Sequence, residues 1–138
     1  KYVNEAIEYM ELKDIEDRYL DELSGGQRQR AYIAMVIAQN TEYVLLDEPL
    51  NNLDMKHSVS MMKVFRRLVD ELGKTVVIVM HDINFASVYS DNIVVLKNGK
   101  LAKDDKTDNI IDKKILEDIY EIDFDIKEIN GNKICIYF

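Results

Sequence analysis

Residues 43–49 read Tyr-Val-Leu-Leu-Asp-Glu-Pro, so a short apolar run leads directly into two carboxylates and a proline. A continuous apolar run of this length is typical of a strand that is buried on both faces of a sheet. Pro49 cannot donate to a strand ladder, so we expect the strand to end there. Residues 75–80 form a second apolar run, which ends at His81.

A helix is predicted between the two strands, over residues 55–72. Its apolar side chains recur at helical spacing along one side, at Val59, Met62, Phe65, Val69 and Leu72. The order strand, helix, strand predicts a parallel pair with a right-handed crossover. Because parallel strands end at the same edge of a sheet, we expect Asp47, Glu48 and His81 to gather at one crevice.

Two carboxylates and a histidine on one rim suit metal-assisted hydrolysis. Asp47 would hold Mg²⁺, usually through water, while Glu48 would orient or deprotonate the attacking water. His81 could donate a hydrogen bond to a phosphate oxygen. A solvated strand end and a structural histidine are the simpler alternatives for these residues.

A second motif, Leu-Ser-Gly-Gly-Gln at residues 23–27, precedes a predicted helix that runs to residue 39. Gly25 and Gly26 would let backbone N–H groups approach an anion, and the helix would point its positive end at it. The Ser24 hydroxyl adds a donor, although the pattern also fits a simple helix cap. The pattern leaves open whether Ser24 serves its own rim or that of a partner. The apolar face of this helix is predicted at Tyr32, Ile33, Val36 and Ile37, with Arg28 and Arg30 outside.

The remaining residues predict a small appendage. A helix opens the chain at residues 2–10, and a strand at 93–96 turns at Asn98-Gly99, a two-residue hairpin signal. Asp104 and Asp105 are expected in a loop, and apolar residues 111–119 mark a surface helix. Two further strands, at 124–129 and 133–138, would be joined by Asn130-Gly131.

Composition limits the possible partners. The 138 residues are 47% apolar and 32% charged, with a net charge of −8, which argues against a nucleic-acid interface. No apolar run approaches the length of a membrane-spanning helix, so we expect any membrane role to act through a partner. Cys135, the only cysteine, fits a reducing compartment and is expected to be a core residue. His57 is expected to be an exposed helix residue.

Together these motifs resemble those of the ABC ATPase family. Residues 23–27 match its LSGGQ signature, 43–47 its Walker B strand and Glu48 its catalytic glutamate, while 51–54 lie where its D-loop lies and His81 where its switch histidine lies. The resemblance implies an α/β fold: a partial P-loop NTPase-type (RecA-like) parallel sheet with flanking helices, part of the helical signature subdomain, and a C-terminal helix with a β-hairpin. It divides the chain into the end of the helical subdomain (1–40), the α/β core (41–102) and the C-terminal helix and hairpin (103–138).

The resemblance also implies a composite site. In a head-to-tail dimer, Ser24, Gly25, Gly26 and Gln27 would face the γ-phosphate of ATP held by the opposite subunit. Asp47 would bind Mg²⁺, Glu48 and His81 would be catalytic, and Asp54 would couple the two sites. The phosphate-binding pattern G-x-x-x-x-G-K-[ST] does not occur in the 138 residues, so we expect an N-terminal half that carries Walker A to be missing, and the chain alone to be inactive. Leu50 and Asn51 replace the commoner Thr-Ser, which is a departure from the family pattern.

Residues 81–84, the Asn98-Gly99 turn and the terminal hairpin resemble those of ATPases from ferric-siderophore and related importers. The resemblance therefore implies the ATPase of a bacterial importer at the cytoplasmic face of the membrane, partnered by permease subunits and, indirectly, by a substrate-binding protein. The alternatives are a soluble ABC-type ATPase that acts on nucleic acid or ribosomes, and a non-catalytic interaction module. The acidic composition disfavours nucleic acid.

Overall fold

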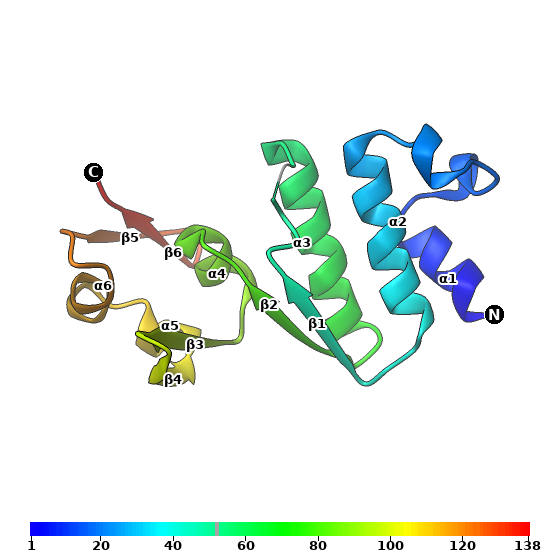
Figure 1. Cartoon of the computed structure of the whole chain (residues 1–138). Coiled ribbons are helices and arrows are strands. Elements are labelled where there is room, and N and C mark those ends of the chain that lie inside the picture. Colours follow the sequence, from blue (N-terminus) through cyan, green and yellow to red (C-terminus); the bar gives the residue numbers. More distant parts are fainter. Residues whose placement is uncertain (52) are drawn as a thin grey trace. The chain divides into compact units, whose positions relative to one another are not determined.

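The computed structural model describes residues 1–51 and 53–138, which form two compact units, Lys1–Met80 and His81–Phe138 (Figure 1). The elements of the first unit are α1 (Tyr2–Tyr9), two 3₁₀ turns (Lys13–Ile15 and Leu20–Glu22), α2 (Gly25–Ala38), β1 (Tyr43–Asp47), α3 (Met55–Asp70) and β2 (Thr75–Val79). Those of the second unit are α4 (Ile83–Tyr89), β3 (Asn92–Lys97), β4 (Lys100–Lys106), α5 (Thr107–Ile110), α6 (Lys113–Tyr120), β5 (Asp125–Ile129) and β6 (Asn132–Ile136). The predicted α/β class is confirmed.

A parallel pair of strands, β1 and β2, forms the sheet of the first unit. The register pairs Val44 with Val76 and Asp47 with Val79, and α3 connects the two strands (Figure 1). The predicted strand–helix–strand unit and its parallel pairing are confirmed. The ends of both strands therefore reach the same edge of the sheet.

The prediction that β1 is buried on both faces was wrong. Val44 is buried, but Tyr43 and Leu45 are 60% and 72% exposed, and on β2 Val77 is 48% exposed. Side chains of a strand alternate between faces, so these three lie on the same, open face. Among the described residues the sheet has two strands, and only the face that carries Val44 is covered.

The helices of the first unit pack by a stripe that partly differs from the expected one. On α3 the buried side chains are Ser58, Met61, Met62, Phe65 and Leu68, while Leu72 lies beyond the helix and is exposed. On α2 the expected apolar Tyr32 is 51% exposed. Arg30, expected outside, is largely buried, with a side-chain exposure of 26% and Nη1 3.8 Å from Glu11 Oε2. Its aliphatic stem takes the inward position because α1 packs against α2.

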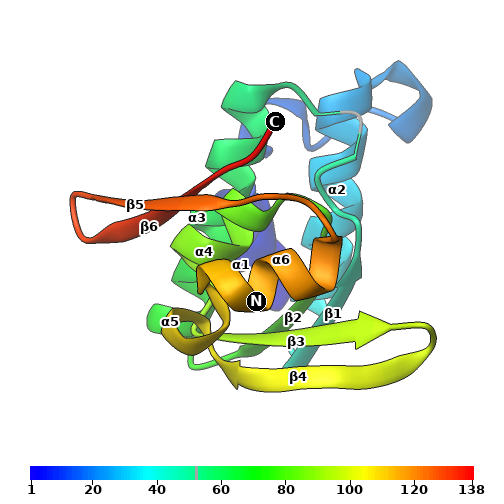
Figure 2. The ribbon, with the colours of Figure 1, turned by 90° about the vertical axis from the view of Figure 1, so that its left-hand side faces the viewer.

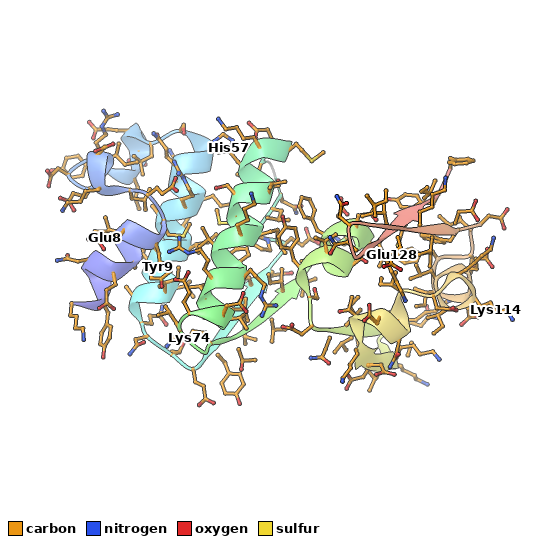
Figure 3. The ribbon with its side chains drawn as sticks, turned by 180° about the vertical axis from the view of Figure 1, so that it is seen from behind. Glu8, Tyr9, His57, Lys74, Lys114 and Glu128 are labelled. Carbon is orange, nitrogen blue, oxygen red and sulfur yellow. The ribbon has the colours of Figure 1, made fainter. Side chains whose placement is uncertain are left out.

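A polar cluster also joins α1 to the end of α3. The Tyr9 hydroxyl donates to Glu71 Oε2 at 2.9 Å, and the Arg67 guanidinium lies 4.8 Å from the centre of the Tyr9 ring. Figure 3 shows Tyr9 on α1 and His57 near the start of α3. His57 is exposed, as predicted, and Arg67 forms an ion pair with Glu71.

The second unit has a closed core of its own. Ile83, Ile111, Leu116, Phe124 and Cys135 are buried together, with Ile93 and Ile126 packed against them. Cys135 is a free, buried thiol, as expected, and its burial raises its pKa. Asn84 ties α4 to β6, since its amide oxygen accepts from Cys135 N at 2.7 Å and its Nδ2 donates to Cys135 O at 3.1 Å.

Both hairpins of the second unit turn where the sequence predicts (Figure 2). Asn98 and Gly99 have φ of 53° and 71°, and Asn130 and Gly131 have 52° and 78°, the left-handed conformation that such turns require. Asp104 and Asp105 were wrongly expected in a loop, because they lie in β4 opposite Val94 and Ile93. The single late helix is in fact α5 and α6, with Ile111 buried between them.

The three functional segments expected from the sequence, 1–40, 41–102 and 103–138, stay a prediction. None of the helices that the structure describes is both long and apolar enough to cross a bilayer.

Candidate functional site

The helix α2 begins at the Leu-Ser-Gly-Gly-Gln motif through a reciprocal cap. Ser24 Oγ accepts a hydrogen bond from Gln27 N at 3.3 Å, and Gln27 Oε1 accepts one from Ser24 N at 3.0 Å. This capping box fixes the first turn of the helix and explains the serine and the glutamine locally. The simpler interpretation of the motif is thus present in the structure, and it orients the helix N-terminus whatever else the motif binds.

The two glycines of the motif leave space around the start of α2. A Cβ at Gly25 would meet no other described atom within 4 Å, and one at Gly26 would lie 3.8 Å from Leu53 Cδ2. Neither glycine is therefore required by packing within the described part of the chain. Gly25 is exposed. This is the arrangement expected of an anion-binding helix start.

The carboxylates of the predicted rim follow β1 directly. Asp47 is the last residue of β1 and is exposed, while Glu48 is half-buried and Pro49 is buried. Glu48 has φ of +47°, and its backbone N–H donates to Val79 O on β2 at 3.0 Å. The rim is therefore held to the neighbouring strand just beyond the end of the parallel pairing.

Two contacts secure this rim that sequence reasoning missed. Gln29 Nε2 donates to the carbonyl oxygen of Pro49, which ties α2 to the residues after β1. Asn51 Nδ2 donates to Glu48 Oε2, and Asn51 N donates to Glu48 O at 3.2 Å. For Gln29 no sequence signal was available. For Asn51 the signal was its departure from the expected serine.

Asp54 caps α3. Its Oδ1 accepts from His57 N at 2.9 Å and lies 2.7 Å from His57 Nδ1. These bonds, the backbone one above all, lower the pKa of the Asp54 carboxyl. The predicted role of Asp54 in coupling two sites stays a prediction. The expected D-loop also includes Asn52, which lies outside the described residues.

His81 is the first residue of the second unit and is exposed, two residues beyond the end of β2. The next residue, Asp82, caps α4 by accepting from Asn84 N at 2.8 Å and Phe85 N at 3.0 Å. The predicted place of His81 on the rim of Asp47 and Glu48 stays a prediction.

An open hollow of about 350 Å³ lies between α2 and the end of β1. Gly25 of the motif and Asp47 of the rim both line it, together with Gln29 and Pro49. Two of the predicted site residues thus border one space within the first unit.

The residues present fit a magnesium ion held with its nucleotide rather than by the protein alone. Among residues 1–51 and 53–138, no cluster of three or more His, Cys, Asp or Glu side chains could hold a metal ion. Mg²⁺ that accompanies a nucleotide is usually held by one or two carboxylates, with phosphate and water supplying the other ligands. The exposed Asp47 carboxylate suits such a site.

Comparison with known proteins gives consistent matches. Residues 1–51 match the sequence profile of the ABC transporter family. The chain is 61% identical over 137 residues to the petrobactin import ATP-binding protein YclP of Bacillus subtilis (strain 168), covering 99% of this chain and 54% of that protein. It is 50% identical over 135 residues to the petrobactin import ATP-binding protein FatE of Bacillus anthracis, covering 98% of this chain and 54% of that one.

Solved structures agree with these matches. An inward-facing metal-chelate type ABC transporter superposes with a TM-score of 0.88 at 24% identity, over 99% of this chain and 56% of that chain, which shows the fold. A dimeric bacterial ABC transporter cassette superposes with a TM-score of 0.63 at 37% identity, over 75% of this chain and 46% of that chain.

The resemblance to the ABC ATPases is thereby confirmed: the chain has the sequence and the fold of part of an ABC transporter ATP-binding protein. Its similarity is to the ATP-binding proteins of siderophore importers in particular. The chain spans about half the length of the curated relatives that it matches.

Proposed function

We propose that this chain is the C-terminal portion of the ATP-hydrolysing subunit of a bacterial ABC importer, and that the cargo is a ferric siderophore or a related iron chelate. The observation that carries the proposal is the identity of 61% and 50% to two petrobactin import ATP-binding proteins over nearly the whole chain. The order of the motifs and the local geometry of Ser24, Asp47 and Glu48 support it.

In the proposed mechanism Asp47 would hold Mg²⁺, and Glu48 would accept a proton from the water that attacks the γ-phosphorus. Mg²⁺ would neutralise charge on the β- and γ-phosphate oxygens. The N-terminus of α2, with Ser24 and the N–H groups of Gly25 and Gly26, would bind the γ-phosphate held by the opposite subunit. His81 would donate to the same phosphate, and Asp54 would couple the two sites.

The partners follow from this arrangement. A second ATPase subunit would supply the opposite half of each site in a head-to-tail dimer. ATP hydrolysis would drive the permease subunits, which the ATPase would contact at the cytoplasmic face of the membrane. A substrate-binding protein would deliver the cargo to these subunits. The isolated chain would not hydrolyse ATP, because G-x-x-x-x-G-K-[ST] does not occur in it.

The test is ATP turnover by the full-length protein with Glu48→Gln, which keeps the shape of the side chain and removes the base. We expect kcat to fall by roughly 10²–10⁴ while MgATP still binds, since a positioned general base contributes that much. Glu42→Gln is the matched control, because Glu42 is an exposed glutamate that precedes β1 at its opposite end. Equal turnover in the two variants would remove Glu48 from the proposed mechanism.

The cargo is tested separately, by uptake of radioactive iron as ferric siderophores into cells that lack the gene. Uptake restored by the wild type and not by Glu48→Gln supports an iron-chelate importer. Normal iron uptake in cells that lack the gene would contradict the proposed cargo but not the proposed ATPase activity.

A further inference from the structure

The Asn51–Glu48 pair is not used by the mechanism above. Glu48 is the last side chain before a proline, and its backbone adopts φ of +47°, which side-chain-bearing residues avoid because Cβ approaches the following carbonyl. Such a conformation persists at a functional site only where neighbouring contacts hold it. One contact is already on β2, where Val79 O accepts from Glu48 N.

Asn51 supplies two more contacts, one to the backbone of Glu48 and one to its side chain. Its backbone N–H donates to Glu48 O at 3.2 Å, and its side-chain Nδ2 donates to the carboxylate oxygen Oε2. The first bond closes the turn after β1. The second bond restricts the rotamers that the Glu48 carboxylate can take. Asn51 itself is exposed, so the burial of its side chain does not explain its place.

The length of the Asn51 side chain also matters. The amide nitrogen of asparagine is one bond further from Cα than a serine hydroxyl would be. A shorter donor at this position, as in Asn51→Ser, would therefore reach less far toward the Glu48 carboxylate.

We propose that Asn51 is a positioning residue for ATP hydrolysis. It holds the Glu48 carboxylate in the orientation in which the carboxylate accepts a proton from the attacking water. The inference rests on the proposed function of Glu48 and adds the residue that orients it. Asn51 touches neither nucleotide nor water in this role and acts only through Glu48.

The second unit contains an equivalent pair without a proposed function. Asn109 Nδ2 donates to Asp105 Oδ1 at 2.9 Å, and this bond is the largest cause of the lowered pKa of the Asp105 carboxyl. An asparagine amide therefore stabilises an ionised carboxylate within this same chain. Asn109→Ala is for that reason a matched control, with the same bond removed at a carboxylate that has no role in hydrolysis.

The experiment measures steady-state ATP hydrolysis and MgATP affinity for the full-length protein, with Asn51→Ala, Asn51→Ser, Asn51→Asp and Asn109→Ala. We expect kcat to fall about 10-fold to 10²-fold in Asn51→Ala, because a misdirected catalytic group costs this much. In Asn51→Asp the side chain keeps its shape but loses the donor and adds a second negative charge beside Glu48, so kcat should fall further. Asn51→Ser should restore part of the loss, and KM for MgATP should stay the same in all of them.

Several outcomes would overturn the inference. If Asn51→Ala and Asn109→Ala have the same kcat, the hydrogen bond from Asn51 to Glu48 is not needed for hydrolysis. A loss that appears in KM alone would assign Asn51 to nucleotide binding, and equal losses in Asn51→Asp, Asn51→Ser and Asn51→Ala would assign it to structure. Each of these results leaves the proposed function standing, provided that Glu48→Gln lowers kcat by the expected factor of roughly 10²–10⁴. A wild-type protein that does not hydrolyse ATP would refute both.

Discussion

The two units of the chain bury their apolar side chains in different ways. In the second unit Leu116 is fully buried, and helices and hairpins close around it and its neighbours. In the first unit the described residues cover one face of the sheet only. Leu45 and Val77, which pair across β1 and β2, are 72% and 48% exposed on the other face.

The difference lies in the closed core of the second unit. Its buried residues Ile83, Ile111, Leu116, Phe124 and Cys135 pack against one another, although Leu96 and Leu101 of the β3–β4 hairpin are 71% and 63% exposed. The open face of β1 and β2 is an apolar surface of the kind that normally binds another element. Because the chain spans about half the length of its relatives, we expect other residues of the full-length protein to cover that face.

The largest expected effect is on stability, when a leucine of each unit is replaced by alanine. Leu116→Ala should lower the free energy of unfolding of the 138-residue chain by about 2–5 kcal/mol, because it leaves a cavity in a closed core. Leu45→Ala should change it by no more than about 0.5 kcal/mol, because the side chain is already exposed. Urea unfolding followed by circular dichroism measures both.

In the full-length protein, the difference between the effects of Leu116→Ala and Leu45→Ala on the free energy of unfolding should become smaller. If the open face is covered there, Leu45→Ala should cost about 2 kcal/mol or more. A cost in the full-length protein as small as that in the chain would mean that this face stays exposed.

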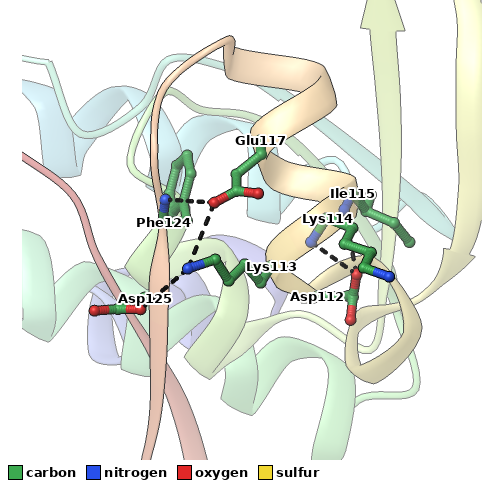
Figure 4. Close-up of polar contacts among 7 residues, drawn as sticks. All are labelled: Asp112, Lys113, Lys114, Ile115, Glu117, Phe124 and Asp125. Carbon is green, nitrogen blue, oxygen red and sulfur yellow. Dashed lines mark hydrogen bonds and ion pairs between the residues drawn. The ribbon is translucent and has the colours of Figure 1, made fainter.

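A smaller effect distinguishes two helix caps. Ser24 caps α2 in the first unit and Asp112 caps α6 in the second, where it accepts from Lys114 N at 3.0 Å and Ile115 N at 3.2 Å (Figure 4). Replacing either by alanine should cost about 0.5–2 kcal/mol of stability. Only Ser24→Ala should also lower ATP turnover in the full-length protein, since only Ser24 is proposed to bind phosphate. Equal turnover in the two variants would leave Ser24 with the capping role alone.

The smallest effect is a pH dependence at two exposed aspartates. Hydrogen bonds from His57 lower the pKa of Asp54, and one from Asn109 lowers that of Asp105. A lowered folded-state pKa stabilises the fold at pH above the ordinary value, about 3.9, and this contribution is lost as the pH falls through the lowered pKa. The difference in urea midpoint between wild type and Asp54→Ala, or Asp105→Ala, should therefore shrink on acidification toward pH 2. A constant difference would mean that neither bond depends on the charge.

Local signals in the sequence were sufficient for most of the helices and strands and for both hairpin turns, although they did not predict α5 or the extent of β4. Two Asn-Gly pairs placed both hairpins, because only residues that tolerate positive φ fit a two-residue turn. Two apolar runs flanking an amphipathic helix predicted the parallel pair of β1 and β2. The position of Asp47 at the end of β1 follows from that pairing.

Tertiary context explains the errors. The run at residues 43–46 looks buried on both faces, yet the described residues cover one face alone. Arg30 looks like a surface residue, but α1 lies over it. The left-handed backbone of Glu48 and its bond from Asn51 could not be predicted, because neither propensity nor periodicity encodes such a contact.

We propose that these residues supply the hydrolytic rim of an ATPase without the segment that binds the nucleotide. The direct test is calorimetric titration of MgATP into the 138-residue chain and, in parallel, into the full-length protein with Glu48→Gln, after circular dichroism has shown both to be folded. We expect no detectable heat from the chain at millimolar nucleotide and stoichiometric binding by the full-length variant. Stoichiometric binding by the folded chain would contradict it.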